Sequence, residues 1–234
     1  GGVKDDLTPD FADRWKATRE RLLEVHGITD KMLTRNRIFL DRMEGTGVLT
    51  PEAAISYGFT GVTLRSTGVG YDVRKDHPYF CYDRVDFDVP VGKHGDNFDR
   101  YLVRMAEVLQ SIRIIDQCLA QMKPGPVNSD DPRVVLPEKA KVYNTIESMI
   151  QHFKIIFEGV QVPPGEVYSY TEAGNGELGF YIVSNGTGKP WKIHVRAPSF
   201  IVMGGIHKLF EGSLLADIIP TFDTVNMIGG ECDR

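Results

Sequence analysis

The chain has 234 residues, of which 41% are hydrophobic, 25% are charged and 10% are aromatic. This composition predicts a folded protein with a sizeable core and excludes a disordered chain. The net charge of -5 gives no electrostatic reason to bind nucleic acid, and no window of about 18 uninterrupted apolar residues predicts a membrane-spanning helix.

Cysteines and histidines are too scattered to predict a metal site. Cys81, Cys118 and Cys232 lie far apart, and an odd number without CxxC spacing predicts neither a disulfide framework nor a zinc or iron–sulfur site. Few, widely spaced cysteines are typical of a protein in a reducing compartment. The six histidines form no HxxxH or HxxE pair, and no GxxxxGK[ST] loop predicts nucleotide binding by this chain.

The first part of the chain predicts helices separated by a long loop. Apolar residues recur at helical spacing from Pro9 to about Arg35, and Thr50-Pro51-Glu52 has the residues of a capped helix start. Residues 58–95 are rich in glycine and charge. That composition predicts an irregular, functional segment with one short strand over residues 83–89.

Two stronger helical patterns follow. One apolar stripe runs from Asp96 to about Met122, where Asp96 can cap the helix and Lys123-Pro124-Gly125 ends it. A second runs from about Leu136 to Phe157. Both stripes predict core packing, and we expect the two helices to form an antiparallel hairpin in a helical bundle.

The periodicity changes after Gly165. Strands are predicted around residues 167–171, 178–183 and 191–195, with a hairpin turn at Ser184-Asn185-Gly186-Thr187-Gly188. Pro198 and the Gly204-Gly205 pair indicate a turn, and residues 211–216 a final helical stretch. The predicted fold is therefore one α+β domain over residues 1–234, mainly α, a helical bundle with a small antiparallel β-hairpin region.

Several segments, in order along the whole chain, resemble one family. They are Tyr57-Gly58-Phe59-Thr60-Gly61 with Leu64-Arg65-Ser66-Thr67-Gly68-Val69, Asp72-Val73-Arg74-Lys75 with Pro78-Tyr79, Asp88-Val89-Pro90-Val91-Gly92 with Asp99-Arg100-Tyr101, Pro163-Pro164-Gly165, Arg196-Ala197-Pro198-Ser199-Phe200, and Gly230-Glu231-Cys232-Asp233-Arg234. Together they are similar to the C-terminal part of the D (49-kDa) subunit of respiratory complex I, the NADH:quinone oxidoreductase. That family is related to the large subunit of nickel–iron hydrogenases.

The resemblance implies a hydrogenase-large-subunit-like fold and a core place in the peripheral arm of complex I, peripheral to the membrane. The implied partners are other complex I subunits, especially the small subunit with the terminal 4Fe-4S cluster, and the N-terminal half of the same subunit. The implied activity of the complex is NADH-to-ubiquinone electron transfer coupled to proton translocation, with ubiquinone in a shared pocket. No catalytic residue, bound cofactor or independent activity is expected for this chain.

The resemblance also bears on location and completeness. We expect the matrix side of the mitochondrial inner membrane, with the cytoplasmic face of a bacterial plasma membrane as the alternative. The start at Gly1-Gly2-Val3, without methionine, predicts a piece of a larger protein. The family's His-bearing loop and its quinone-headgroup Tyr precede this start in the family pattern and have no counterpart to assign here.

The C-terminal tail carries the quinone prediction. Hydrogenase large subunits end in an Asp-Pro-Cys-x-x-Cys segment whose thiolates bind the metals, and the matching positions here are Asn226, Met227, Ile228 and Glu231. An isoleucine cannot ligate a soft metal, so no metal site is expected. Apolar and glycine residues suit the wall of a quinone cavity instead. By the resemblance, Ile228 matches a family position that lines the quinone pocket, and the residues predicted to bind quinone are Ile228, Met227 and Gly229.

The resemblance also bears on a set of charged residues and on positions where the chain differs from the family. Arg65, Asp72 and Arg74, in the glycine-rich segment, are predicted to contact a neighbouring subunit. The chain also departs from the family pattern at four positions: Asn175 replaces a basic residue, Asn226 the tail acid, Gly229 the tail Phe, and Cys232 a usual apolar residue. The departure at Asn175 removes any role that depends on the missing positive charge.

Arg196 follows the predicted hairpin, and we expect it to brace a loop through its forked guanidinium donors. Glu231 and Asp233 crowd negative charge at the tail, which favours a solvated or interface role over proton relay.

Two alternatives stay open. The chain can be a subunit of a related membrane-bound hydrogenase-type complex, which requires tail cysteines for nickel and is tested by metal analysis. It can also be a structural scaffold subunit without quinone contact, and then substitutions at Ile228 leave quinone affinity unchanged.

Overall fold

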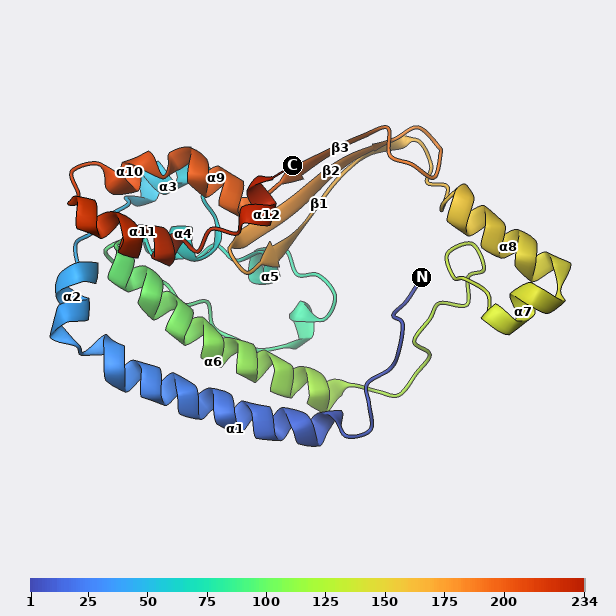
Figure 1. Ribbon diagram of the computed structural model, residues 1–234, viewed down its shortest axis with the longest axis horizontal. Coiled ribbons are helices and arrows are strands. Elements are labelled where there is room, and N and C mark those ends of the chain that lie inside the picture. Colours follow the sequence, from blue (N-terminus) through green and yellow to red (C-terminus); the bar gives the residue numbers. More distant parts are fainter. Residues whose placement is uncertain (234) are drawn as a thin grey trace. The chain divides into compact units, whose positions relative to one another are not determined.

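A computed structural model describes residues 1–233, which divide into two compact units (Figure 1). The larger unit contains residues 13–121, 170–179 and 195–233, and the smaller unit contains residues 1–12, 122–169 and 180–194. The sequence predicted a single domain over residues 1–234. Each strand of the sheet contributes residues to both units.

The larger unit is mainly helical. Its longest elements are α1 (Phe11–Thr29), which begins in the smaller unit and continues as a π-helical stretch (Asp30–Thr34), and α6 (Asn97–Gln121). The shorter helices are α2 (Arg37–Met43), α3 (Pro51–Ser56), α4 (Gly61–Arg65), α5 (Val73–Asp76), α9 (Pro198–Gly205), α10 (His207–Phe210), α11 (Ile218–Val225) and α12 (Gly229–Cys232), with 3₁₀ turns at Tyr82–Arg84 and Leu215–Asp217.

Polar caps fix the starts of the predicted helices. The Thr50 hydroxyl accepts from the Ala53 N–H at 3.2 Å at the start of α3, and the Asp96 carboxylate accepts from the Asp99 N–H at 2.8 Å at the start of α6. Each bond satisfies a backbone donor that the first turn leaves free. The predicted helices from Pro9, Thr50 and Asp96 are confirmed.

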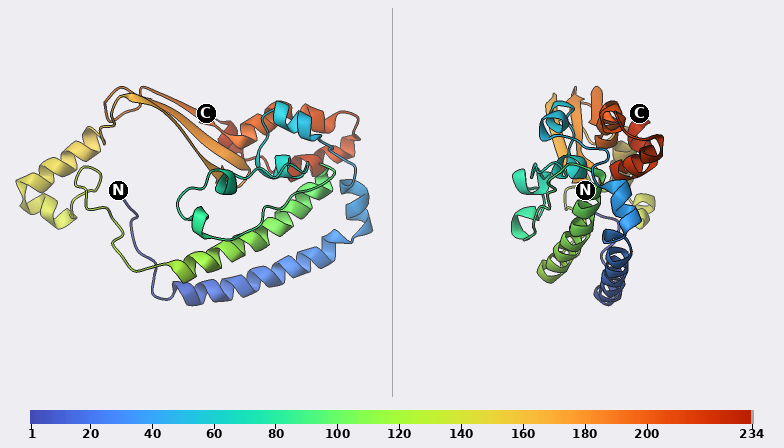
Figure 2. Two further views of the ribbon diagram at one scale, coloured as in Figure 1. Left: turned by 180° about the vertical axis from the view of Figure 1, so that it is seen from behind. Right: turned by 90° about the vertical axis from the view of Figure 1, so that its left-hand side faces the viewer.

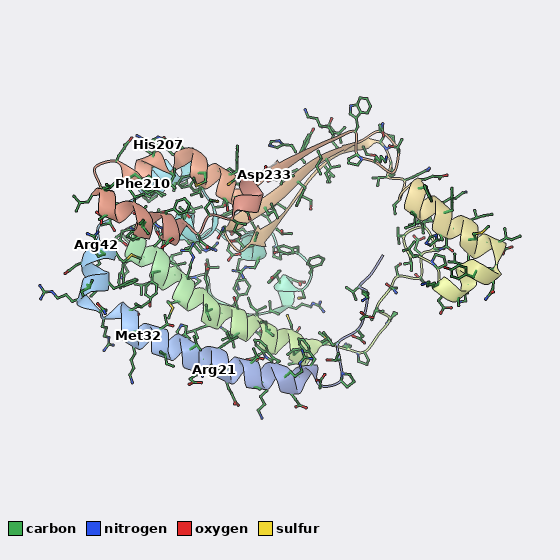
Figure 3. All side chains as sticks on the ribbon, viewed as in Figure 1. Arg21, Met32, Arg42, His207, Phe210 and Asp233 are labelled. Carbon is green, nitrogen blue, oxygen red and sulfur yellow. The ribbon has the colours of Figure 1, made fainter. Side chains whose placement is uncertain are left out.

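A polar seam joins α1 and α6, which run side by side in both views of Figure 2. Trp15 Nε1 and Arg19 Nε each donate at 2.8 Å to the Asp116 carboxylate, and the His26 ring donates to the Met105 carbonyl oxygen at 3.0 Å. No residue of α1 is buried. Met32, just beyond α1, is 63% exposed and projects from the chain (Figure 3).

The strand predicted over residues 83–89 is wrong. The segment begins as a 3₁₀ turn and continues as irregular chain, and its backbone pairs with side chains of α6. The Asp86 N–H donates to Gln117 Oε1 at 2.8 Å and the Asp88 N–H donates to Gln110 Oε1 at 3.0 Å. Amide side chains thus replace the neighbouring strand that a sheet requires.

The principal core lies at the C-terminal helices rather than along the α6 stripe. Phe59 and Leu64 pack there with residues of α9 to α11; the buried members are Leu49, Ala54, Phe59, Leu64, Val202, Leu209 and Val225. Of the stripe residues predicted for α6, Ile112 is buried, whereas Phe98 and Tyr101 pack against Phe39 of α2. The stripe indicated a helix correctly but overstated its burial.

The smaller unit contains α7 (Lys139–Asn144) and α8 (Ile146–Phe157), which pack against each other. The helix predicted from Leu136 is therefore split, because Thr145 adopts an extended conformation between the two. No residue of α8 is buried, and α8 and α6 belong to different units. The predicted core packing of this stripe is thus wrong for the described residues, and the antiparallel hairpin with α6 stays a prediction.

A three-stranded antiparallel sheet has the order β1 (Gly165–Ala173), β2 (Gly176–Ser184), β3 (Lys192–Arg196). The predicted strands and the hairpin after Ser184 are confirmed. The tight turn at Gly174-Asn175 between β1 and β2 was not predicted, although Gly and Asn are typical turn residues.

The C-terminal helices correct two further predictions. Pro198 and Gly204-Gly205 indicated a turn, but Pro198 occupies the first turn of α9, where its missing N–H costs nothing. Residues 211–216, predicted helical, fall mostly between α10 and the 3₁₀ turn. Among the described residues, no helix has both the length and the apolar character needed to traverse a bilayer.

Cys81 and Cys118 provide a test of how the extended segment packs on α6. Their sulfur atoms lie 3.9 Å apart beside the cluster of Val85, Phe87 and Ile114. Diamide, which takes up two electrons and two protons from a thiol pair, should convert the two thiols to one disulfide. Thiol titration should then fall from three free groups to one.

Matched variants define the outcome. Cys118→Ser should abolish the cross-link, and Cys232→Ser should leave it intact. A cross-link that persists in Cys118→Ser would contradict the described packing.

Candidate functional site

The candidate site is the C-terminal tail and the backbone that positions it. Helix α11 ends at Asn226, whose backbone is left-handed with φ 55° and ψ 51°. Asparagine tolerates this conformation better than most residues with a side chain. The left-handed residue turns the chain away from α11 and into Met227 and Ile228.

Three side chains, here named the Asn clasp, fix this turn: Asn175, Asn226 and Ser199. Asn175 Nδ2 donates to the Asn226 carbonyl oxygen at 2.6 Å and to Ser199 Oγ at 3.1 Å, and Asn226 Nδ2 donates back to Asn175 Oδ1 at 3.1 Å. The Ile228 N–H donates to Ser199 Oγ at 3.3 Å. The main chain is therefore hydrogen-bonded on both sides of Met227.

The tail is also bonded to the start of α9. The Ser199 N–H donates to Glu231 Oε2 at 2.9 Å. A carboxylate at the N-terminus of a helix accepts a free backbone donor and interacts favourably with the helix dipole. Glu231, predicted to be a solvated or interface acid, is thus a cap of α9.

The predicted quinone-binding residues have different surroundings. Met227 is half-buried and packs against the principal core, whereas Ile228 is 44% exposed and Gly229 is exposed. Contact of these residues with a quinone stays a prediction. Asp233, labelled in Figure 3, marks the end of the described tail beyond α12.

The turn that carries Asn175 lies directly against the start of α4. A Cβ at Gly61, where φ is +65°, would lie 2.5 Å from the Asn175 carbonyl oxygen, so only glycine fits. Thr60 Oγ1 accepts from the Glu177 N–H at 3.0 Å on the other side of the turn.

Arg196 braces the same region. Its Nη1 donates to the Glu177 carbonyl oxygen and its Nη2 to the Gly58 carbonyl oxygen, both at 2.7 Å. The predicted bracing role is confirmed, and it ties β3 to both β2 and the segment before α4.

Buried charges fix the end of β1. The Arg65 side chain, 3% exposed, donates from Nη1 to Glu172 Oε1 at 2.8 Å and from Nε to Glu107 Oε1 at 3.0 Å. Glu172 also accepts from the Val73 N–H at 3.3 Å. One guanidinium thus connects α4, α6 and β1.

Asp72 and Arg74 form a second, adjoining pair. Arg74 donates to the Asp72 carboxylate from Nε at 3.0 Å and from Nη2 at 2.7 Å, and Asp72 lies 3.8 Å from Arg65. The Arg65 and Asp72 side chains are 3% and 0% exposed in this chain, and their contact with a neighbouring subunit stays a prediction. For Arg74, 16% exposed, subunit contact stays a prediction.

The two carboxyls of this cluster differ in acidity. Burial is the largest influence on both and acts to raise the pKa. For Asp72 the hydrogen bonds and charge of Arg74 outweigh burial, and the pKa lies below its ordinary value. For Glu172 burial prevails over the attraction of Arg65, and the pKa lies above its ordinary value.

A buried arginine links α6 to α11. Arg100 is fully buried and donates to the carbonyl oxygens of Gly47 and Gly95 and to Thr224 Oγ1, at 2.7, 2.9 and 3.1 Å. Burial lowers its pKa to about 10. These bonds position the helix from which the tail emerges.

Among the described residues, two of the hollows in the surface lie away from the tail. One of about 780 Å³ lies in the smaller unit between α8 and residues 131–134, and one of about 880 Å³ lies in the larger unit between residues 90–94 and the start of α6. Within residues 1–233, no three His, Cys, Asp or Glu side chains gather as a metal site would require.

Two of the residues at which the chain departs from the pattern implied by the resemblance meet in the clasp. The Asn175 side-chain amide bonds to the Asn226 carbonyl oxygen, and the Asn226 side-chain amide bonds to Asn175 Oδ1. No sequence pattern indicated this pairing, because 51 positions separate the two residues. The hydrogen bond between the Asn175 and Asn226 side chains is therefore found only in the structure.

Asp72→Asn tests the buried pair. Removing one partner of a buried ion pair costs about 3 kcal/mol of unfolding free energy. Because the folded pKa of Asp72 is lowered, its stabilisation is complete above the ordinary pKa of about 3.9 and is lost as pH falls through the folded value. The difference from wild type, measured by urea unfolding, should be constant above about pH 5 and shrink below about pH 4.

The exposed Asp83 supplies the control, because Asp83→Asn should change stability by less than about 0.5 kcal/mol. Equal effects of the two substitutions would contradict the burial of Asp72.

Comparison with known proteins identifies the family. The model described as "Respiratory-chain NADH dehydrogenase, 49 Kd subunit" matches residues 1–234. The chain is 54% identical to the D subunit of the NADH-quinone oxidoreductase of Myxococcus xanthus and 53% identical to a D subunit of the same enzyme from Sorangium cellulosum, over all of this chain in both cases. It spans just over half of these relatives, 56% and 58% of their lengths.

These names favour the complex I interpretation over the hydrogenase-type alternative. With a match over its full length, the chain belongs to the family of the 49-kDa subunit of the respiratory-chain NADH dehydrogenase.

Proposed function

We propose that this chain belongs to the quinone module of a bacterial NADH-quinone oxidoreductase, and that its tail forms part of the wall of the quinone pocket. The reaction belongs to the complex: electrons from NADH reduce ubiquinone, coupled to proton translocation. Family membership supports this proposal, and the names of the relatives describe a NADH-quinone oxidoreductase.

The observation that carries the proposal is an apolar side chain fixed at an exposed position. Ile228 is 44% exposed, yet its main chain is bonded to Ser199 and follows the clasped Asn226. Quinone reduction needs an apolar wall that excludes water around the ring and donors near its carbonyl oxygens. Ile228 supplies part of the first requirement and none of the second.

The remaining parts of the pocket come from partners in this proposal. The neighbouring small subunit supplies the terminal 4Fe-4S cluster as electron donor, and the N-terminal half of the 49-kDa subunit supplies the polar groups at the headgroup. This chain lies in the arm of the complex that is peripheral to the membrane. The bacterial relatives favour the cytoplasmic face of a plasma membrane over the mitochondrial matrix side expected first.

The purified chain by itself should oxidise no NADH and show no iron–sulfur absorbance, because every redox centre is assigned to its partners. Optical spectra and iron analysis of the purified chain check this. A cluster present in stoichiometric amount would refute the assignment.

Ile228→Ala in the assembled complex tests the quinone contact. Loss of buried apolar contact to the ring should raise the KM for decylubiquinone up to about tenfold, with little change in kcat. Ile219→Ala is the matched control, because Ile219 in α11 is 70% exposed, and it should leave KM unchanged.

NADH:ferricyanide activity, which bypasses the quinone pocket, should be normal in both variants. An unchanged KM and inhibitor sensitivity in Ile228→Ala would instead support a scaffold subunit without quinone contact.

A further inference from the structure

The Asn clasp is built from groups that carry no charge. Asn175 and Ser199 are 5% and 2% exposed, and each of their side chains is hydrogen-bonded to the tail. An amide presents a donor and an acceptor together, so Asn175 can donate to the Asn226 backbone and accept from its side chain. A carboxylate or an ammonium at either position supplies only one of these functions.

The clasp acts on the main chain rather than on a ligand. It bonds the carbonyl group of Asn226 and the N–H of Ile228, which lie on either side of Met227. Met227 packs into the principal core, so the backbone on both sides of it is fixed and sets the position of the exposed Ile228 side chain. A shift of the Asn175 turn is therefore passed to Ile228 through Asn226 and Ser199.

Asn175 has its own fixed support. Gly61 contacts its carbonyl group, and Glu172, three residues earlier, is bonded to Arg65 and to the Val73 N–H. A buried hydrogen-bonding group on a rigid turn places its partner more accurately than a group on a free loop.

We propose that Asn175 and Asn226 are positioning residues for quinone reduction, setting the location of Ile228 in the pocket without touching the quinone. This inference rests on the proposed function of the tail. In this proposal a neutral pair of amides fixes the position of the apolar side chain in the pocket wall. It predicts that the effects of substituting the two residues are not additive.

The experiment is a double-mutant cycle in the assembled complex with decylubiquinone as substrate. Asn175→Ala removes three hydrogen bonds and should raise KM about tenfold, with kcat within about twofold of wild type. Asn226→Gly keeps the left-handed backbone, removes one bond, and should raise KM about threefold. The double variant should be no worse than Asn175→Ala, because both changes remove the same pair.

Controls separate positioning from folding. Asn185→Ala removes a side-chain amide whose oxygen accepts from Thr187 in its own turn. It should leave KM unchanged, both in the wild-type background and in combination with Asn175→Ala. NADH:ferricyanide activity reports assembly of every variant. If Asn175→Ala does not assemble, the milder Asn226→Gly decides: a raised KM supports positioning, and an unchanged KM overturns it.

The outcomes also separate this inference from the proposed function. If Ile228→Ala raises KM but the clasp variants do not, or if their effects simply add, the clasp proposal is wrong and the quinone contact stands. If Ile228→Ala has no effect, the proposed function itself fails.

Discussion

The structure of the site depends on one close approach between backbones. The turn joining β1 and β2 lies against the start of α4, where Gly61 has a positive φ and no room for a Cβ. Gly176 mirrors it, since a Cβ there would lie 2.5 Å from Thr60 Oγ1. Two segments far apart in the sequence can meet this closely only where both lack a side chain. The contacts that Asn175 makes with the tail begin at this junction.

The junction is supported in two chemically different ways. On one side are the buried ions of Arg65, Glu172 and Asp72, and on the other is the neutral clasp. Buried ion pairs contribute little net stability because desolvation offsets their attraction, but leaving one partner unpaired is costly. The ions therefore enforce a single arrangement of the turn. The Asn clasp then fixes the tail relative to this turn, and its side chains place no charge beside the apolar Ile228.

Local patterns predicted local structure well. Thr50 and Asp96 each act within a few residues of their position, so the helix starts at α3 and α6 followed from sequence. The hairpin after Ser184 likewise depends on adjacent turn residues. The burial of Arg65 did not follow from sequence, because its partner Glu172 lies 107 positions away and charged residues in a glycine-rich segment ordinarily face solvent. The exposed stripe of α8 shows the same limit, because periodicity indicates an apolar face without indicating what covers it.

The candidate site was predicted only in outline. Family resemblance directed attention to Ile228, but Ser199 and Asn175 became visible as tail contacts only in three dimensions. Ser199 could have been suspected from its place beside Pro198, where the first turn of a helix leaves N–H groups free. No comparable signal existed for the pairing of Asn175 with Asn226.

The glycine at position 61 also has a consequence for how this chain can vary. A methyl group there cannot be absorbed by rotating a side chain, because the atoms it would strike are main-chain atoms of the neighbouring turn. The turn would have to retreat, taking Asn175 with it, and the displacement would reach Asn226 and the residues that follow it. A substitution at position 61, which takes no part in any reaction, would thereby alter the shape of the segment after α11.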